Sequence, residues 1–262
     1  MKMRTHLIYF IFLVIILLKS SEIALKNILR ARIVLKVARP IIIFVIISII
    51  LSFLFLILSK LEAKEFLNAI SFNIFQFFLF GFCLIAGFTE GAKTNLPAFP
   101  FLHLGWKGAN YLKRRGFPTF SLKRFFRIFF LMIFGSISIW IFFSPEITKE
   151  TQEIFEKSGF AQLSLILSVL SAAIIEETVF RFFLQTELIR YLKIPAVGII
   201  ITSAIWAMGH SGMVIPSGVK ELQIFYVGII LGIIRNYWGI EICILLHLLM
   251  NILFSLFFFL FS

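Results

Sequence analysis

The stretch Leu170-Ser-Ala-Ala-Ile-Ile-Glu-Glu-Thr-Val-Phe-Arg181 places two glutamates, Glu176 and Glu177, inside a long apolar helical pattern that covers 160–192. A helix of this length and apolar character is expected within a lipid bilayer. An ionised carboxylate is costly there unless it is paired or has a functional task. The stretch therefore predicts a membrane-spanning helix that carries part of a functional site.

The composition of the chain supports this prediction. The 262 residues are 60% hydrophobic and include 35 Phe, and the mean hydropathy is +1.03. Membrane strands would alternate apolar and polar residues, whereas the apolar runs here are unbroken. The fold class is therefore predicted to be all-α, a polytopic membrane protein with about eight transmembrane helices. The formal net charge of +12 is expected in cytoplasmic loops, since no polar domain would present it to nucleic acid.

Eight apolar segments define the expected spans. They cover residues 7–18, 40–58, 66–88, 125–143, 160–192, 195–210, 222–237 and 239–262. The first is interpreted as a retained helix, because no small-residue cleavage site follows it. We expect one membrane domain over 1–262, with no sign of chemistry in 1–145 and a catalytic core in 160–255. The protein is expected to be multi-pass, and to lie in the cell membrane if it is prokaryotic.

Glu177 and Arg181 lie four residues apart, and residues at this spacing share one face of an α-helix. An ion pair between them would neutralise one carboxylate within the membrane. Glu176 points to another side of the helix. The residue four positions later on that side is Phe180, which carries no charge. The pattern therefore predicts a structural role for Glu177 and leaves Glu176 available for chemistry.

Two later apolar segments each carry one histidine. His247 and Asn251 lie four residues apart, so they project from one face of the last helix and could direct two hydrogen-bond donors at one oxyanion. His210 ends the sixth span, and Trp206 lies one turn earlier on the same face. The ring of Trp206 is expected to form a wall of the site and to limit rotation of the histidine.

These residues resemble the signature of the CPBP family, the glutamic intramembrane proteases that include the type II CAAX prenyl endopeptidases. The first family motif is a Glu pair followed after three residues by Arg, and 176–181 matches it. The second is Phe-x-x-x-His, from which Trp206-Ala-Met-Gly-His210 departs by having Trp in place of Phe. The third is His-x-x-x-Asn, which 247–251 matches. The resemblance covers about residues 160–255.

The resemblance implies a metal-independent peptidase with eight transmembrane helices and no cofactor. By this resemblance, Glu176 and His210 activate a water. His247 and Asn251 stabilise the oxyanion, and Glu177 and Arg181 shape the site. The implied substrates are prenylated CAAX tails in eukaryotic and some archaeal relatives, and peptides or membrane proteins in bacterial ones. The expected partners are thus the lipid bilayer and a membrane-anchored or lipidated peptide, with no nucleic acid.

Other proteolytic mechanisms fit the sequence less well. Aspartyl proteases need two Asp, and the sequence contains none. A zinc site made of Glu176, His210 and His247 is chemically plausible. The string Gly209-His210-Ser211-Gly212 fits a rhomboid-type serine site with His247 as partner, although it leaves the glutamate pair without a role.

A non-enzymatic membrane scaffold, immunity factor or transporter is a further alternative. In a transporter, intramembrane Glu and His would relay protons. No inverted repeat in the sequence supports this alternative.

Gly228 and Gly232 form a small-xxx-small pattern, which is expected to permit close helix contact.

Overall fold

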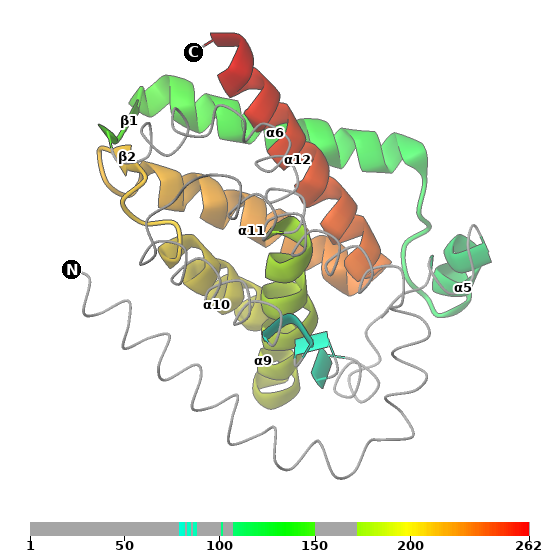
Figure 1. Ribbon diagram of the computed structural model, residues 1–262. Coiled ribbons are helices and arrows are strands. Elements are labelled where there is room, and N and C mark those ends of the chain that lie inside the picture. The colour runs from blue at the N-terminus through cyan, green and yellow to red at the C-terminus, as the bar shows by residue number, and fades with distance from the viewer. Residues whose placement is uncertain are drawn as a thin grey trace, which may run out of the picture.

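The computed structural model describes residues 79–81, 83–84, 86–87, 101, 107–149 and 172–261. The expected spans at 7–18 and 40–58, and most of the span at 66–88, lie outside the described residues. The named elements, shown in Figure 1, are α5 (Lys107–Arg114), α6 (Leu122–Phe143), β1 (Glu146–Ile147), η1 (Glu177–Leu184), α9 (Gln185–Leu192), α10 (Pro195–Met208), β2 (Val214–Ile215), α11 (Val219–Trp238) and α12 (Ile240–Phe261).

Four of the expected spans coincide with α6, α10, α11 and α12, and local signals explain their ends. The Ser121 side chain caps α6 by accepting a hydrogen bond from the Arg124 amide at 3.3 Å. Pro195 stands in the first turn of α10, where its missing N–H costs nothing. Gly239 separates α11 from α12 with a φ of 93°, which suits glycine.

α6 is the helix in the described part of the chain that best fits the length and hydropathy of a membrane span. It alone among the described helices is both long and apolar enough to cross a membrane, while α10 and residues 240–254 are apolar but shorter. Its exposed face carries large apolar side chains, as a lipid-facing surface requires; they include Phe126, Phe130, Phe134, Ile141 and Phe142. The number of eight spans stays a prediction.

The helix with the glutamate pair differs from the regular α-helix that we expected. Residues 172–176 are α-helical, but η1 from Glu177 to Leu184 is a π-helix. The change occurs where the Thr178 hydroxyl donates to the Ile174 carbonyl at 2.8 Å, a bond that competes with the main-chain pattern. π-Helical segments are rare and often mark functional sites.

A small two-stranded sheet accompanies the helices, which agree with the expected all-α fold class. β1 and β2 pair antiparallel, with Glu146 opposite Ile215 and Ile147 opposite Val214. Both strands lie in connecting segments, and their β-branched residues favour extended backbone. The sheet joins the segment after α6 to the loop between α10 and α11, a loop that also contains His210.

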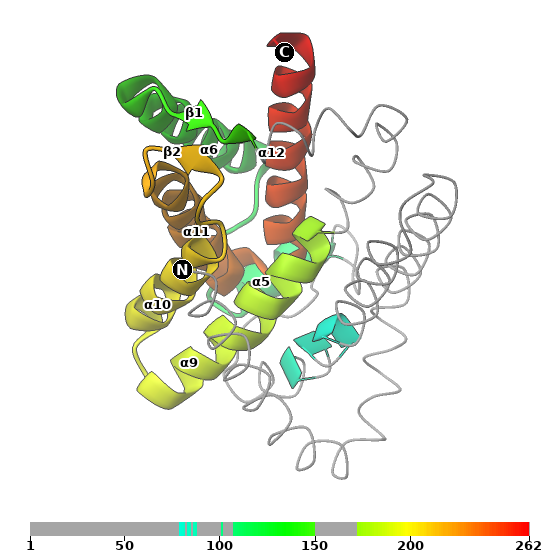
Figure 2. The ribbon, with the colours of Figure 1, turned by 60° about the vertical axis from the view of Figure 1, so that its left-hand side comes forward.

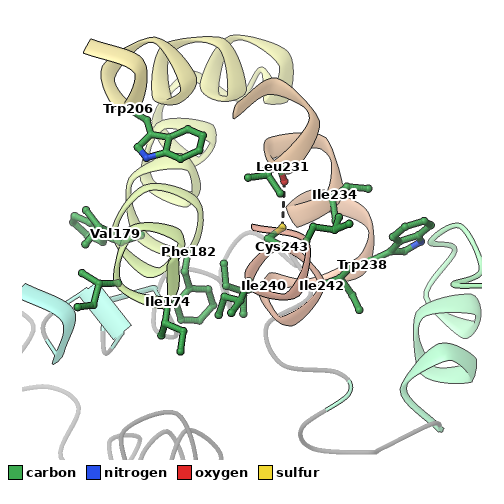
Figure 3. Packing of buried hydrophobic residues seen from close by; sticks show 14 of the residues in the cluster. Ile174, Val179, Phe182, Trp206, Leu231, Ile234, Trp238, Ile240, Ile242 and Cys243 are labelled. Carbon is green, nitrogen blue, oxygen red and sulfur yellow. Dashed lines mark hydrogen bonds between the residues drawn. The ribbon is translucent and has the colours of Figure 1, made fainter. Parts of the chain in front are cut away.

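The helices around η1 position the site. Figures 1 and 2 show α11 between α6 and α10, with η1, α9 and α12 crossing this layer. Gly228 and Gly232 allow α10 to approach α11, since an added Cβ would lie 2.9 Å from the Ser203 Cβ and 2.7 Å from the Ile199 Cγ2 respectively. The predicted close contact at these glycines is confirmed. Figure 3 shows part of the resulting apolar core, to which Phe182, Trp206 and Leu231 contribute from three helices.

Candidate active site

Glu176, Trp206 and His210 meet where the glutamate helix packs against the end of α10. The Trp206 indole Nε1 donates to Glu176 Oε2 at 2.7 Å. The His210 Nδ1 lies 3.0 Å from the Trp206 carbonyl oxygen, and its Nε2 lies 4.0 Å from Glu176 Oε2. Glu176 Oε2 and His210 Nε2, which can each accept a hydrogen bond, therefore face each other across a short gap.

Glu177 and His247 form a second pair. The His247 Nδ1 lies 2.9 Å from Glu177 Oε1. The expected partner of Glu177, Arg181, is farther away, with its Nε 3.9 Å from Glu177 Oε2 and no hydrogen bond to it. The i,i+4 pairing thus exists as a loose ion pair, and the closer contact of Glu177 comes from α12.

Trp206 lies between the two pairs. Its ring centroid is 5.5 Å from that of His210 and 5.3 Å from that of His247, both in edge-on geometry. The Arg181 guanidinium lies 4.4 Å from the centroid of the same ring, within cation–π range. The sequence predicted an aromatic wall at Trp206, and the ring indeed borders both histidines.

Exposure distinguishes the two pairs. The side chain of Glu176 is 28% exposed and that of His210 is 19% exposed. The side chain of Glu177 is fully buried and that of His247 is 8% exposed. The Glu176–His210 pair is therefore the one that a water or a peptide can reach.

Asn251 lies on α12 four residues after His247 and is half-buried. Both belong to one continuous α-helical stretch, so they share a face as the spacing predicts. The structure therefore brings the motif residues of the glutamate helix and α10 together with His247, and places Asn251 one turn away on the same helix.

Lys220 is a charged neighbour that sequence reasoning missed. Its Nζ donates to Gln223 Oε1 at 3.0 Å, and the Trp140 indole donates to the same oxygen at 3.0 Å. It precedes the apolar span expected at 222–237. Burial lowers the pKa of Lys220 to about 8, and the negative charge of Glu176 partly offsets that effect.

A positive charge from another helix is thus close enough to Glu176 to interact with it electrostatically. A lysine at the start of an apolar helix resembles an ordinary interface anchor, so only its position shortly after the His210 loop could have indicated this role.

Gly228 has a second role, beside the predicted helix contact, that the sequence did not reveal. An added Cβ at this position would lie 3.1 Å from the Arg181 Nη2 and 3.0 Å from the Ser203 Oγ. The Arg181 side chain is fully buried, and its nitrogens have no hydrogen-bond partner among the described residues. The absent side chain of Gly228 therefore provides room for the guanidinium against the Trp206 ring.

The rhomboid-type and zinc alternatives find little support in this geometry. Ser211 is exposed, and its hydroxyl donates to the Met208 carbonyl at 2.8 Å rather than to His247. Within the described ranges, no three His, Cys, Asp or Glu side chains are grouped closely enough to hold a metal ion. The two glutamates are instead divided between the two histidines.

Comparison with protein families identifies the segment that holds this site. Residues 159–253 match the family Type II CAAX prenyl endopeptidase Rce1-like. The Rce1-like segment contains Glu176, Glu177, His210, His247 and Asn251, and it covers just over a third of the chain. It coincides with the segment on which the CPBP resemblance was based. The residues of the candidate site therefore lie in a segment that is similar to this family. Comparisons with curated proteins and with solved structures gave no match.

Proposed function

We propose that this protein is an intramembrane endopeptidase that hydrolyses peptide bonds of membrane-associated substrates. The observation that carries the proposal is the 4.0 Å separation of Glu176 Oε2 and His210 Nε2 in the accessible part of the site, within a segment that matches Rce1-like endopeptidases. The substrate class is a CAAX-tail-like or bacterial membrane peptide. The chain acts as a multi-pass membrane protein and needs neither cofactor nor metal.

The first chemical step is activation of a water. A main-chain carbonyl only accepts hydrogen bonds, so the contact with the Trp206 oxygen requires the proton of a neutral His210 on Nδ1. Its Nε2 then has a free lone pair. A water about 2.8 Å from both Glu176 Oε2 and His210 Nε2 would donate one hydrogen bond to each acceptor, and Glu176 would take one of its protons as the water attacks. Its oxygen lone pairs would then be directed at the scissile carbonyl carbon.

The second step is stabilisation of the tetrahedral oxyanion by His247 and Asn251. An ionised Glu177 only accepts, so the His247 Nδ1 donates to it. The His247 Nε2 is then directed away from Glu177. A His247 with both nitrogens protonated donates from Nε2 to the oxyanion, and the buried Glu177 carboxylate balances its charge. Asn251, on the same face of α12, supplies the second donor.

Collapse of the intermediate expels the leaving amine. The proton that Glu176 took from the water passes to the amine nitrogen, so the base of the first step is the acid of the second. The C–N bond breaks, and the new carboxylic acid keeps the oxygen and the second proton of the water, so every proton is accounted for. No group outside the chain and the water is needed.

The proposal is tested with purified protein in liposomes and three synthetic peptides. One peptide carries a prenylated CAAX tail, the second is its unprenylated form, and the third is an apolar bacterial-type transmembrane peptide. Wild type should cleave at least one, Glu176→Gln should cleave none, and Glu146→Gln, a change in the exposed β1 strand, should match wild type. Activity should also survive exhaustive chelation. Equal cleavage by wild type and Glu176→Gln, or none by either, would favour a non-enzymatic role. Loss of cleavage on chelation, with recovery on adding zinc, would favour a metalloprotease.

A further inference from the structure

Trp206 is the position at which the chain departs from the Phe-x-x-x-His pattern. Phenylalanine has no hydrogen-bond donor on its ring, whereas the Trp206 indole donates to Glu176 Oε2 at 2.7 Å. The donor–acceptor distance is short, as is typical when the acceptor is a charged carboxylate. Trp206 is 1% exposed, so water does not compete with the carboxylate for the indole N–H. The departure from the pattern therefore adds a strong contact to the carboxylate.

The same residue also holds the imidazole of the accessible pair. The Trp206 main-chain oxygen lies 3.0 Å from His210 Nδ1, while its side chain binds Glu176. Packing fixes the ring itself, since Arg181 lies 4.4 Å from its centroid and the His247 ring lies 5.3 Å away. One residue thus sets the positions of both Glu176 Oε2 and His210 Nε2.

We propose that Trp206 is a positioning residue whose indole N–H orients the Glu176 carboxylate so that Oε2 and the His210 Nε2 face the same water. The inference rests on the proposed role of Glu176 as the base. It predicts that Trp206 supports activity through its N–H donor. The larger size of indole compared with the Phe ring of the family pattern should matter less.

Two substitutions at position 206 separate the donor from the bulk. Trp206→Phe removes both, whereas replacement of Trp206 by 3-benzothienylalanine keeps the bicyclic shape and removes only the N–H. Both should lower kcat by roughly tenfold to hundredfold, as expected for a lost hydrogen bond to a charged group, with KM little changed. Trp238→Phe is the matched control: it removes the indole bond to the Pro118 carbonyl and should leave kcat as in wild type. Full kcat in the benzothienylalanine protein would overturn the proposal, whatever the phenylalanine variant does.

A second measurement does not depend on turnover. The chain has four Trp, so indole N–H resonances of ¹⁵N-labelled protein are few, and Trp206→Phe assigns the one of interest. In Glu176→Gln the Trp206 proton resonance should move upfield, because a neutral amide accepts a weaker hydrogen bond than a carboxylate. The Trp238 resonance should stay in place.

An unchanged Trp206 resonance in Glu176→Gln would also overturn the inference. The two possible failures are distinguishable. A shifted resonance in a protein that cleaves no peptide would contradict the proposed function but leave the hydrogen bond standing, whereas cleavage that depends on Glu176 but not on the indole N–H would contradict only the inference.

Discussion

Glu177 Oε1 and His247 Nδ1 lie 2.9 Å apart although 70 positions separate the two residues in the sequence. This contact joins the π-helical segment to α12 inside the core, where Glu177 is fully buried. Glu176, the preceding residue, instead contacts Trp206 and approaches His210. Two neighbouring carboxylates therefore serve two different histidines, and their substitutions should differ in kind.

Glu177→Gln should lower stability, and Glu176→Gln should not. Loss of the Glu177 charge removes the carboxylate that the structure places nearest to the buried Arg181. It also weakens the bond to His247, and together these losses should cost about 3 kcal/mol. Glu176 is more exposed, so Glu176→Gln should abolish turnover with little change in unfolding temperature. Thermal unfolding in detergent and peptide cleavage are measured on the same preparations. Equal destabilisation by the two variants would contradict the division of roles.

Lys220 should make the activity fall as the pH rises through about 8. Its pKa is lowered to about 8, so its ammonium is charged below that pH and neutral above it. The charge balances the negative charge of Glu176, and this balance is lost on the alkaline side. Lys220→Arg stays charged and should keep its activity to higher pH, whereas Lys220→Met should be slower throughout and lack the decline near 8.

Profiles of kcat/KM from pH 6 to 10 test this prediction. Lys149→Met, a change at an exposed lysine after β1, serves as the control and should follow wild type. A Lys220→Arg profile that declines at the same pH as wild type would show that another group is responsible for the alkaline loss.

Gly228→Ala should disturb the site through Arg181. The new Cβ would lie 3.1 Å from the guanidinium and 2.9 Å from the Ser203 Cβ, so α10 and α11 must separate or Arg181 must move. Such overpacking typically costs about 1–3 kcal/mol, and displacement of Arg181 from the Trp206 ring should lower kcat as well. Gly81→Ala is the control, since its Cβ meets no atom of the described residues within 4 Å. Unfolding and cleavage data that are the same for both alanine variants would contradict this account.

Asn251→Ala tests the oxyanion assignment. A donor that acts mainly in the transition state should affect kcat more than KM, and loss of one such donor typically lowers kcat by roughly 10²–10³. Combined with His247→Ala, it should cost less than the sum of the single effects, because both donors serve one charge. A raised KM with normal kcat would instead assign Asn251 to substrate binding.

Much of the helical framework was predictable because its signals are local. Unbroken apolar runs define the helices, and Pro195 and Gly239 mark two of their ends through backbone preferences that depend on a few neighbouring residues. The motif residues themselves were also recognisable, since their spacing places them on single helix faces. These signals sufficed to place α6, α10, α11 and α12.

The pairing inside the site was not predictable in the same way. Which histidine contacts which glutamate depends on how the helices are rotated about their axes and how they cross. The π-helical segment that begins at Glu177 changes the directions in which the following side chains project. The sequence therefore favoured Arg181 as the partner of Glu177, while the closer contact comes from His247. Lys220 was missed for the same reason, because its proximity to Glu176 arises only when α11 packs beside the glutamate helix.

The length of α10 has a consequence for the lipid around the protein. Its 14 residues extend roughly 21 Å, well short of the ~30 Å hydrocarbon core of an ordinary bilayer. As a spanning helix, α10 would suffer hydrophobic mismatch, and the membrane beside it would have to thin or the polar loop after Met208 would have to sink below the headgroups. Either response shortens the path of water to His210. Acyl-chain length would then act as a rate-setting variable, because the bilayer itself would determine how readily hydrolysis obtains its water.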